Sequence, residues 1–234
     1  RAISDPRVSY HYKINEERAA ARNMGTRLSR GRYINFLDSD DLLYENHLSV
    51  ASEFLEARGE PEFIHLGYEM RNSVTNETSR KNDLPPTANG VLLQGNHFSC
   101  NGVFLRRDIA ENHPFNQDRA LSGTEDYELW LRLAGRYQLH CDNRITSVIL
   151  EHEGRSVMER DRRKLEKRIE LLEKYLFEDA EFVKSFEKDI PAFKAGNRIY
   201  IALHLALNTK RRGAIEYLIK AIACSPKSLT ARAF

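Results

Sequence analysis

The chain has 234 residues, of which 41% are hydrophobic and 30% charged, a balance that excludes a disordered or collagen-like protein. Its 36 Lys and Arg nearly match its 34 Asp and Glu, and the net charge of +2 gives no reason to expect a nucleic-acid partner. No apolar run approaches the roughly 18 residues that a membrane span needs. The three scattered cysteines, Cys100, Cys141 and Cys224, predict reduced thiols and a cytoplasmic location.

Strands and helices alternate in the first third of the sequence. Strands are predicted for residues 8–12, 33–37 and 63–66, and helices for residues 16–29 and 46–58. The second of these strands, YINFL, is almost entirely apolar, as expected of a strand that is buried on both faces. The alternating order predicts an α/β fold with a largely parallel sheet.

The middle of the chain is less regular. Residues 71–90 are polar and predict a long loop. Strands are expected for residues 97–105, 137–142 and 145–151. A helix is expected for residues 125–134, where apolar side chains recur at helical spacing.

The last part of the sequence predicts only helices, over residues 160–176, 193–207 and 214–223. The first of them carries an apolar stripe of Leu165, Ile169, Leu172 and Leu176. We therefore expect two regions, an α/β domain over residues 1–155 and a helical region over residues 156–234. The last two helices are similar to one tetratricopeptide-type hairpin, so a protein partner bound through these helices is one interpretation.

Three carboxylates follow the predicted central strand: Asp38, Asp40 and Asp41, with Ser39 among them. Ligands of open parallel sheets bind at this edge. Crowded carboxylates repel one another unless a cation offsets their charge, and a divalent metal could also bridge to a diphosphate. The alternative is an acidic cap that begins a helix.

Three segments, in this order, resemble signatures of the family 2 glycosyltransferases. The first is ARNMG at residues 21–25 followed by GRYINFLDSDD at 31–41, the second is NGVFLRR at 101–107, and the third is TEDYELWLRLA at 124–134. The resemblance covers roughly residues 4–157. Three ordered segments are far more specific than any one of them.

The resemblance implies a GT-A fold, with a mixed, mostly parallel sheet between helices. It implies an inverting glycosyltransferase that moves a sugar from a nucleotide-diphosphate donor, expected to be a UDP-sugar, to a glycan or lipid-linked acceptor. It also implies Mn²⁺ or Mg²⁺ bound by Asp40 and Asp38, with His152 approaching the metal. From the residues alone, His152 fits a structural histidine equally well.

By the same resemblance, Asp126 is the base that removes the proton of the acceptor hydroxyl, and Glu125 is the neighbouring alternative or an acceptor contact. A hydroxyl is a poor nucleophile, and a carboxylate within hydrogen-bond reach can take its proton as it attacks. From the residues alone, Thr124, Glu125 and Asp126 also fit the start of a helix, where the helix dipole favours acids.

The resemblance further implies that Arg22, Asn23, Asp38 and Ser39 contact the nucleotide sugar. An arginine can bind phosphate or carboxylate with two parallel hydrogen bonds. The alternative for Arg22 is an ordinary solvated helix charge.

The chain also departs from the family. The family's first apolar strand and its Asp-Asp-Gly-Ser segment are not found before Arg1. We therefore expect an internal, N-terminally truncated piece of a longer protein, and activity of this piece alone is left open. The alternatives are a nucleotidyltransferase on a related fold and a non-catalytic interaction protein.

Residues 155–168 carry seven Lys or Arg against three Asp or Glu, which fits a solvated helix face or, alternatively, peripheral contact with an anionic membrane.

Overall fold

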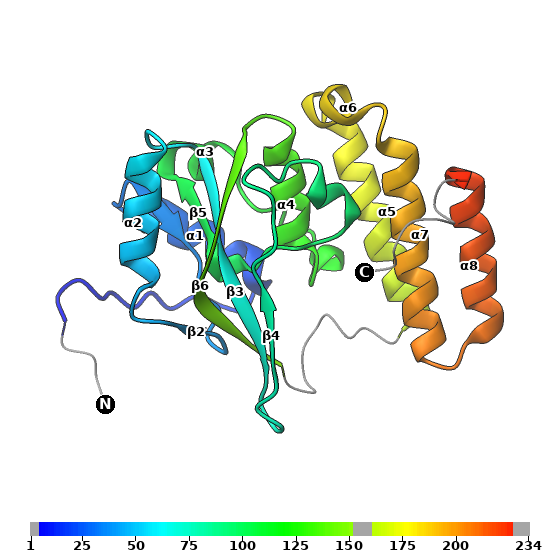
Figure 1. Cartoon of the computed structure of the whole chain (residues 1–234), viewed down its shortest axis with the longest axis horizontal. Coiled ribbons are helices and arrows are strands. Elements are labelled where there is room, and N and C mark those ends of the chain that lie inside the picture. Colours follow the sequence, from blue (N-terminus) through cyan, green and yellow to red (C-terminus); the bar gives the residue numbers. More distant parts are fainter. Residues whose placement is uncertain (1–4, 152–160, 227–234) are drawn as a thin grey trace.

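A six-stranded mixed sheet forms the centre of the α/β region (Figure 1). The computed structural model describes residues 5–151 and 161–226. The strands run in the order β1 (Tyr33–Asn35), β5 (Val103–Arg106), β3 (Phe63–Asn72), β6 (Leu139–Glu151) and β2 (Leu42–Leu43), and β4 (Thr78–Lys81) pairs with β3 off this path.

The strand pairings are less parallel than the alternating order of strands and helices predicts. Strand β5 pairs antiparallel with both β1 and β3, so β1 and β3 run in the same direction without touching. Strands β3 and β6 pair parallel over ten residues of β3, whereas β2 and β4 pair antiparallel. The described sheet is therefore mixed. Four of its five pairings are antiparallel: two involve β5, which lies between β1 and β3, and two involve β2 and β4.

Helices cover the sheet and extend beyond it. They are α1 (Glu17–Leu28), α2 (His47–Ala57), α3 (Arg107–Asn112), α4 (Glu125–Ala134), α5 (Arg162–Glu178), α6 (Ala180–Phe186), α7 (Ile190–Leu207) and α8 (Arg211–Cys224), with 3-10 turns at Val91–Gln94, Cys100–Gly102 and Arg119–Leu121. Among the helices of the described residues, none combines the length and the apolar character that a membrane span requires.

The two faces of the sheet are buried against different helices, because successive side chains of a strand point to opposite sides. In β3, Ile64 packs with Phe54 of α2, on one face. Its neighbour Phe63 packs on the other face against Trp130 of α4, with ring centroids 5.7 Å apart. Figure 1 shows α2 and α4 on the two sides of the sheet.

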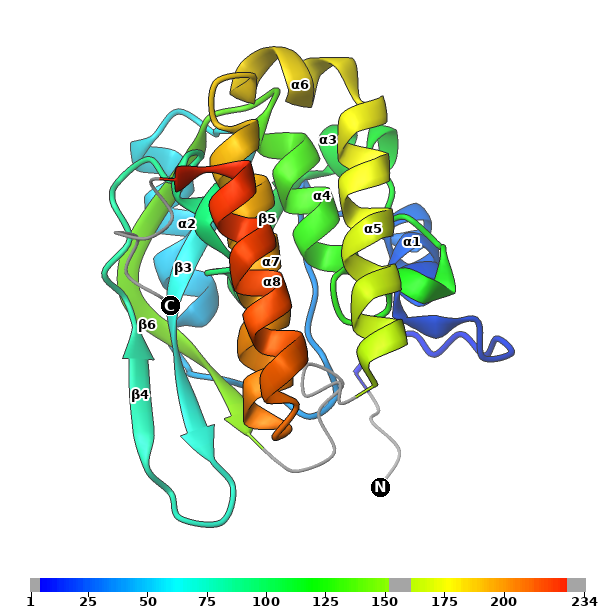
Figure 2. The same ribbon diagram turned by 90° about the vertical axis from the view of Figure 1, so that its right-hand side faces the viewer.

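The helical region shares its hydrophobic core with the α/β region. The predicted apolar stripe of α5 is buried, and its Leu172 belongs to the same cluster of side chains as Trp130 of α4 and Phe193 of α7. Figure 2 shows α5 beside α4, and α7 beside α8 as the predicted hairpin. The expected boundary between the two regions, at residues 155 and 156, lies outside the described residues.

Four local predictions differ from the structure. The strand expected at residues 97–105 begins only at Val103, because Cys100–Gly102 form a 3-10 turn. Residues 8–12 form no strand, and Tyr10 is 86% exposed. The expected loop at 71–90 includes β4, which forms a hairpin with β3. The two strands expected at 137–142 and 145–151 are one strand, β6, because an irregularity opposite Gly67 absorbs the polar residues between them.

Two glycines give a matched test of this packing. A Cβ at Gly102 would lie 2.7 Å from the carbonyl oxygen of Leu66 and 2.8 Å from Nε2 of His65, whereas a Cβ at Gly25 of α1 would meet nothing within 4 Å. We expect Gly102→Ala to lower the free energy of unfolding by about 1–3 kcal/mol. Gly25→Ala should raise it by about 0.5–1 kcal/mol, because alanine favours helix. Urea unfolding measures both, and equal midpoints would contradict the described packing.

Candidate active site

The loop that contains Asp38, Ser39, Asp40 and Asp41, here called the acidic loop, connects one strand to another. It follows β1 and the buried Phe36, and it continues into β2. The next helix, α2, begins only at His47, so the interpretation of the loop as a helix cap is wrong. Within the loop Asp38 is partly buried, whereas Ser39 and Asp40 are exposed.

The second acidic pair lies in the first turn of α4, as predicted for a helix that begins at Thr124. Glu125 is buried, and its Oε2 accepts a hydrogen bond of 2.6 Å from the backbone N–H of Gly123. Asp126 is partly exposed, and its Oδ1 accepts the N–H of Tyr127 at 2.7 Å. The two neighbours therefore differ: Glu125 is buried, and Asp126 is only partly buried.

One arginine joins the two acidic segments. Arg22 of α1 is only 8% exposed, so the alternative interpretation as a solvated helix charge is wrong. Its Nη2 donates to Oδ1 and Oδ2 of Asp38, at 2.8 and 3.0 Å, and its Nη1 donates to Oε1 of Glu125 at 3.0 Å. A guanidinium suits this task, since its donors form a rigid planar fork. The bond also crosses 103 residues of sequence, which fixes the acidic loop against the start of α4.

Asn23 contacts protein backbone on both sides of its amide. Its Nδ2 donates to the carbonyl oxygen of Phe115 at 2.9 Å, and its Oδ1 accepts the N–H of Phe115 at 2.8 Å. The guanidinium of Arg22 lies 5.3 Å from the centre of the Phe115 ring. In the structure Asn23 therefore supports the residue that packs against Arg22.

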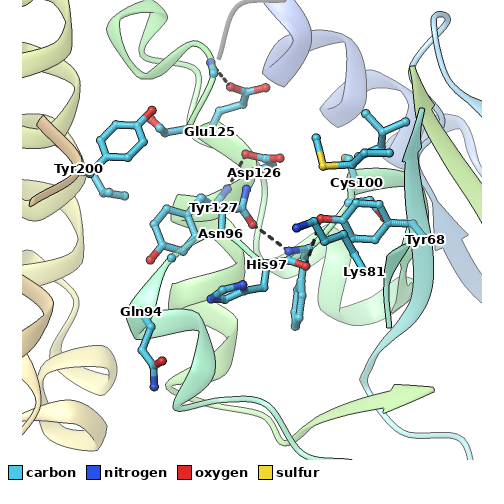
Figure 3. Close-up of a pocket in the computed structure, with 18 of the residues that line it drawn as sticks. Tyr68, Lys81, Gln94, Asn96, His97, Cys100, Glu125, Asp126, Tyr127 and Tyr200 are labelled. Carbon is cyan, nitrogen blue, oxygen red and sulfur yellow. Dashed lines mark hydrogen bonds between the residues drawn. The ribbon is translucent and has the colours of Figure 1, made fainter. Parts of the chain in front are cut away.

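A cavity of about 500 Å³ connects the two acidic segments. Asp38 and Asp41 line it from the acidic loop, and Glu125 and Asp126 line it from α4. Figure 3 shows Asp126 directed toward its centre. Asp40 lies in the same loop, between Asp38 and Asp41, but is not among the residues that form the wall. The acidic loop and Asp126 therefore share one cavity, to which the loop contributes Asp38 and Asp41.

Asp41 is anchored on both sides. Its Oδ1 accepts the backbone N–H of Leu150 at 3.3 Å, and its Oδ2 accepts Nδ2 of Asn101 at 3.4 Å. These bonds link the acidic loop to β6 and to the turn before β5. The motif NGVFLRR, which contains Asn101, therefore supports the loop directly.

The cavity raises the proton affinity of Asp126. Burial, followed by the adjacent charge of Glu125, raises the pKa of Asp126 to about 6, although Arg22 acts in the opposite direction. A carboxyl with this pKa is mostly ionised at neutral pH and is still basic enough to accept a proton. Such a perturbed group in a cavity is a candidate general base.

The acidic residues can supply some of the ligands of a metal ion, but they do not supply a complete set. Within residues 5–151 and 161–226, no three His, Cys, Asp or Glu side chains converge on one point. His152, the further expected ligand, lies outside the described residues. Mg²⁺ commonly takes only one or two carboxylates, with phosphate oxygens and water as its other ligands. The exposed carboxylate of Asp40 beside Asp38 fits a cation of this kind that is shared with a diphosphate.

Three other residues line the cavity although no pattern in the sequence predicts that they belong to the site. Gln94 and Asn96 come from the loop before β5, and Tyr200 comes from α7. In the sequence these residues stand outside all three signature segments. Tyr200 reaches the site because α7 contacts the 3-10 turn at Val91–Gln94, another part of the cavity wall (Figure 3).

Comparisons with known proteins agree with this geometry. Residues 1–113 match the family model for glycosyl transferase family 2. An uncharacterized glycosyltransferase of Rickettsia bellii is 46% identical over 67 residues, which cover 28% of this chain and 9% of the relative. WfaP of Escherichia coli, a UDP-Glc:α-D-GlcNAc-diphosphoundecaprenol β-1,3-glucosyltransferase, is 31% identical over 121 residues, or 50% of this chain and 45% of that protein.

The fold also matches a solved structure. TarS 1–349 of S. aureus, in complex with UDP-GlcNAc, superposes with a TM-score of 0.52 and 12% sequence identity, over 86% of this chain and 69% of TarS 1–349. The sequence matches span 9–11% of the length of the rickettsial relatives.

Replacing Arg22 should expose its importance for stability. Arg22→Met leaves Asp38 and Glu125 without their shared cation, and we expect a loss of about 3–5 kcal/mol in the free energy of unfolding. Arg106 is the matched control, because it also binds two carboxylates, Glu62 and Asp108, but at the surface. Arg106→Met should cost less than about 1 kcal/mol. Equal losses in urea unfolding would show that the Arg22 bridge has no special weight.

Proposed function

We propose that this chain, whose residues 1–113 match the family model for glycosyl transferase family 2, transfers a sugar from a UDP-sugar to a hydroxyl of a glycan or lipid-linked acceptor, with inversion. The observation that carries this proposal is the Arg22 bridge, because it places the acidic loop and Asp126 on one cavity. The names of two similar proteins add support for the donor, since WfaP uses UDP-Glc and TarS was solved with UDP-GlcNAc.

Asp126 is the proposed base. Its Oδ1 is occupied by the N–H of Tyr127, which leaves Oδ2 to accept the proton of the acceptor hydroxyl. The acceptor oxygen then forms a bond to the anomeric carbon of the donor. The bond from that carbon to the diphosphate oxygen breaks, and UDP departs with the electron pair. A single displacement of this kind inverts the anomeric configuration, and no covalent sugar–enzyme species is needed.

The acidic loop is the proposed site of the donor diphosphate. Asp40 and Asp38 would hold Mn²⁺ or Mg²⁺ together with that diphosphate, and His152 stays a predicted further contact. When bound, the metal supplies positive charge that stabilises the departing diphosphate. Ser39, exposed beside Asp40, is a proposed donor contact.

The other predicted residues are assigned positioning roles. The guanidinium of Arg22 is already shared by Asp38 and Glu125, so we assign it to the alignment of the two acidic segments. Glu125 is held by Arg22 and Gly123 and would orient α4, which leaves Asp126 as the reacting carboxylate. Asn23 would act through Phe115. A cytoplasmic location and peripheral membrane contact stay predictions.

Asp126 gives the most direct test of the chemistry. Asp126→Asn keeps the shape of the side chain but cannot accept the proton, and we expect the rate of sugar transfer to fall about 10²- to 10⁴-fold. The wild-type kcat/KM should decrease about tenfold for each pH unit below about 6, as Asp126 becomes protonated. Release of UDP, followed by chromatography, measures both effects.

The control for this substitution is Asp108→Asn, which changes a carboxylate in the first turn of α3, away from the cavity. It should keep the wild-type pH profile. An Asp126→Asn protein with wild-type activity would refute the assignment of the base. Release of pyrophosphate in place of UDP would indicate a nucleotidyltransferase.

Asp40 tests the proposed donor and metal site. With Mg²⁺ present, Asp40→Ala should weaken UDP binding at least about tenfold, because one of few carboxylates near the cation is lost. Removal of Mg²⁺ with EDTA should weaken binding by the wild-type protein and change the variant little. Glu45→Ala, which removes an exposed carboxylate just after β2, is the control. Calorimetric titration that finds equal UDP affinity in all three proteins would refute the site.

A further inference from the structure

The helical region forms one wall of the cavity that contains Asp126. Helix α7 contributes Asn197, Tyr200 and Leu203 to this wall, and α5 contributes Ile169 and Leu172. These helices lie beyond the residues that match the family model. We propose that this wall binds the acceptor, that the acceptor is a neutral sugar ring, and that Tyr200 is a residue that selects it. The inference rests on the glycosyl transfer proposed above.

The charges around the cavity favour a neutral ligand at this wall. Among the described residues that line it, five are carboxylates and three are cations: Asp38, Asp41, Asp83, Glu125 and Asp126 against Arg18, Arg22 and Lys81. Arg22 is occupied by two of these carboxylates, and Nε of Arg18 lies 3.5 Å from Glu125. An acceptor with its own negative charge beside Asp126 would meet mainly repulsion.

Tyr200 is placed so that its ring can contact a ligand in the cavity. It is partly buried at the edge of the shared core, and its ring centre lies 4.3 Å from that of His204. Burial raises the pKa of Tyr200, although Arg168 acts in the opposite direction. The hydroxyl therefore stays protonated; it accepts a hydrogen bond from Arg168 and can donate its own proton to a ligand. Figure 3 shows Tyr200 on the α7 side of the cavity, across from Tyr68 and Lys81, with Asp126 between the two sides.

Two side-chain amides line the cavity together with Tyr200. Gln94 and Asn96 are exposed on the loop before β5 and line the cavity together with Tyr127 and Tyr200 (Figure 3). An amide offers both donors and an acceptor, which matches the mixed requirement of sugar hydroxyls. The C–H groups on the face of a sugar ring pack well against an aromatic ring. A wall made of apolar, aromatic and amide groups next to a base is thus suited to an uncharged pyranose with one hydroxyl directed at Asp126.

A buried arginine behind the wall explains how Tyr200 is held. Arg168 of α5 is only 6% exposed, and its Nε and Nη1 have no hydrogen-bond partner among the described residues. Its guanidinium faces Gly123, whose Cβ position would lie 3.3 Å from Nη1, and its charge also acts on the hydroxyl of Tyr200. Arg168 thus lies between the loop that precedes Glu125 and the tyrosine of α7.

The test measures UDP release from a UDP-sugar panel, without an acceptor and with methyl β-D-glycosides. Methyl β-D-glucopyranoside and methyl β-D-glucuronide form a matched pair that differs only by the carboxylate. We expect neutral methyl glycosides to be glycosylated, and the glucuronide to be used at least tenfold less well. Tyr200→Ala should lower the ratio of transfer to donor hydrolysis about tenfold, through a higher KM for the acceptor. Tyr200→Phe should lower it much less.

Two controls separate binding from folding. Tyr217→Ala removes a buried tyrosine of α8 that lies away from this cavity, and it should leave the ratio of transfer to hydrolysis unchanged. Leu203→Glu adds a charge to the cavity wall at a side chain that is already 43% exposed and should also lower the ratio. Leu207→Glu, one turn later and 69% exposed, lies outside the cavity wall and should not.

The inference is overturned if Tyr200→Ala and Leu203→Glu keep the wild-type ratio, or if the glucuronide is preferred. It is equally overturned if UDP-sugar is hydrolysed and no neutral glycoside is bound or glycosylated. A protein that neither binds UDP nor hydrolyses any UDP-sugar would instead contradict the proposed transferase function itself.

Discussion

The site depends on one buried guanidinium that holds two carboxylates from distant parts of the chain. Arg22 forms ion pairs with both Asp38 and Glu125, and it does so from a helix that contributes no reacting group. Asp126, next to Glu125, forms no ion pair within the described residues and keeps a raised pKa. The bridge thus divides the acidic residues into those that fix the geometry and one that is available to take up a proton.

The supporting structure around this bridge follows from ordinary packing. Phe115 lies against Arg22 and is held in place by both ends of the Asn23 amide. Asn101 fixes Asp41 from the other side. The three signature segments of the sequence therefore meet through hydrogen bonds and ion pairs, and each segment supplies contacts that another segment needs.

Local patterns in the sequence predicted the helices, because helix formation depends mainly on residues that are close in the sequence. The bounds of α4 were predicted to the residue, because its apolar spacing and its acidic first turn are local features. The long apolar stripe likewise predicted α5. The insertion of β5 between β1 and β3 could not be predicted, since the partner of a strand depends on residues far away in the sequence. The strand expected at residues 8–12 has the right alternation but no strand beside it.

The same distinction applies to the site. The residues Arg22, Asp38, Glu125 and Asp126 were identified from resemblance, and the structure brings all four together. That Arg22 binds carboxylates could not be read from the sequence, because its partners lie 16 and 103 residues away. The contribution of Tyr200 had no signal at all, since an amphipathic helix is equally consistent with a core helix.

The continuous core limits how the molecule can move. Helix α7 forms a wall of the cavity, yet its Phe193 and Ile201 are buried in the cluster that also contains Trp130 of the α/β region. An outward movement of α7 would expose this core to water, and its free-energy cost would be far higher than that of rearranging a surface loop. The helical wall of the cavity is therefore a fixed template for whatever binds beside Asp126.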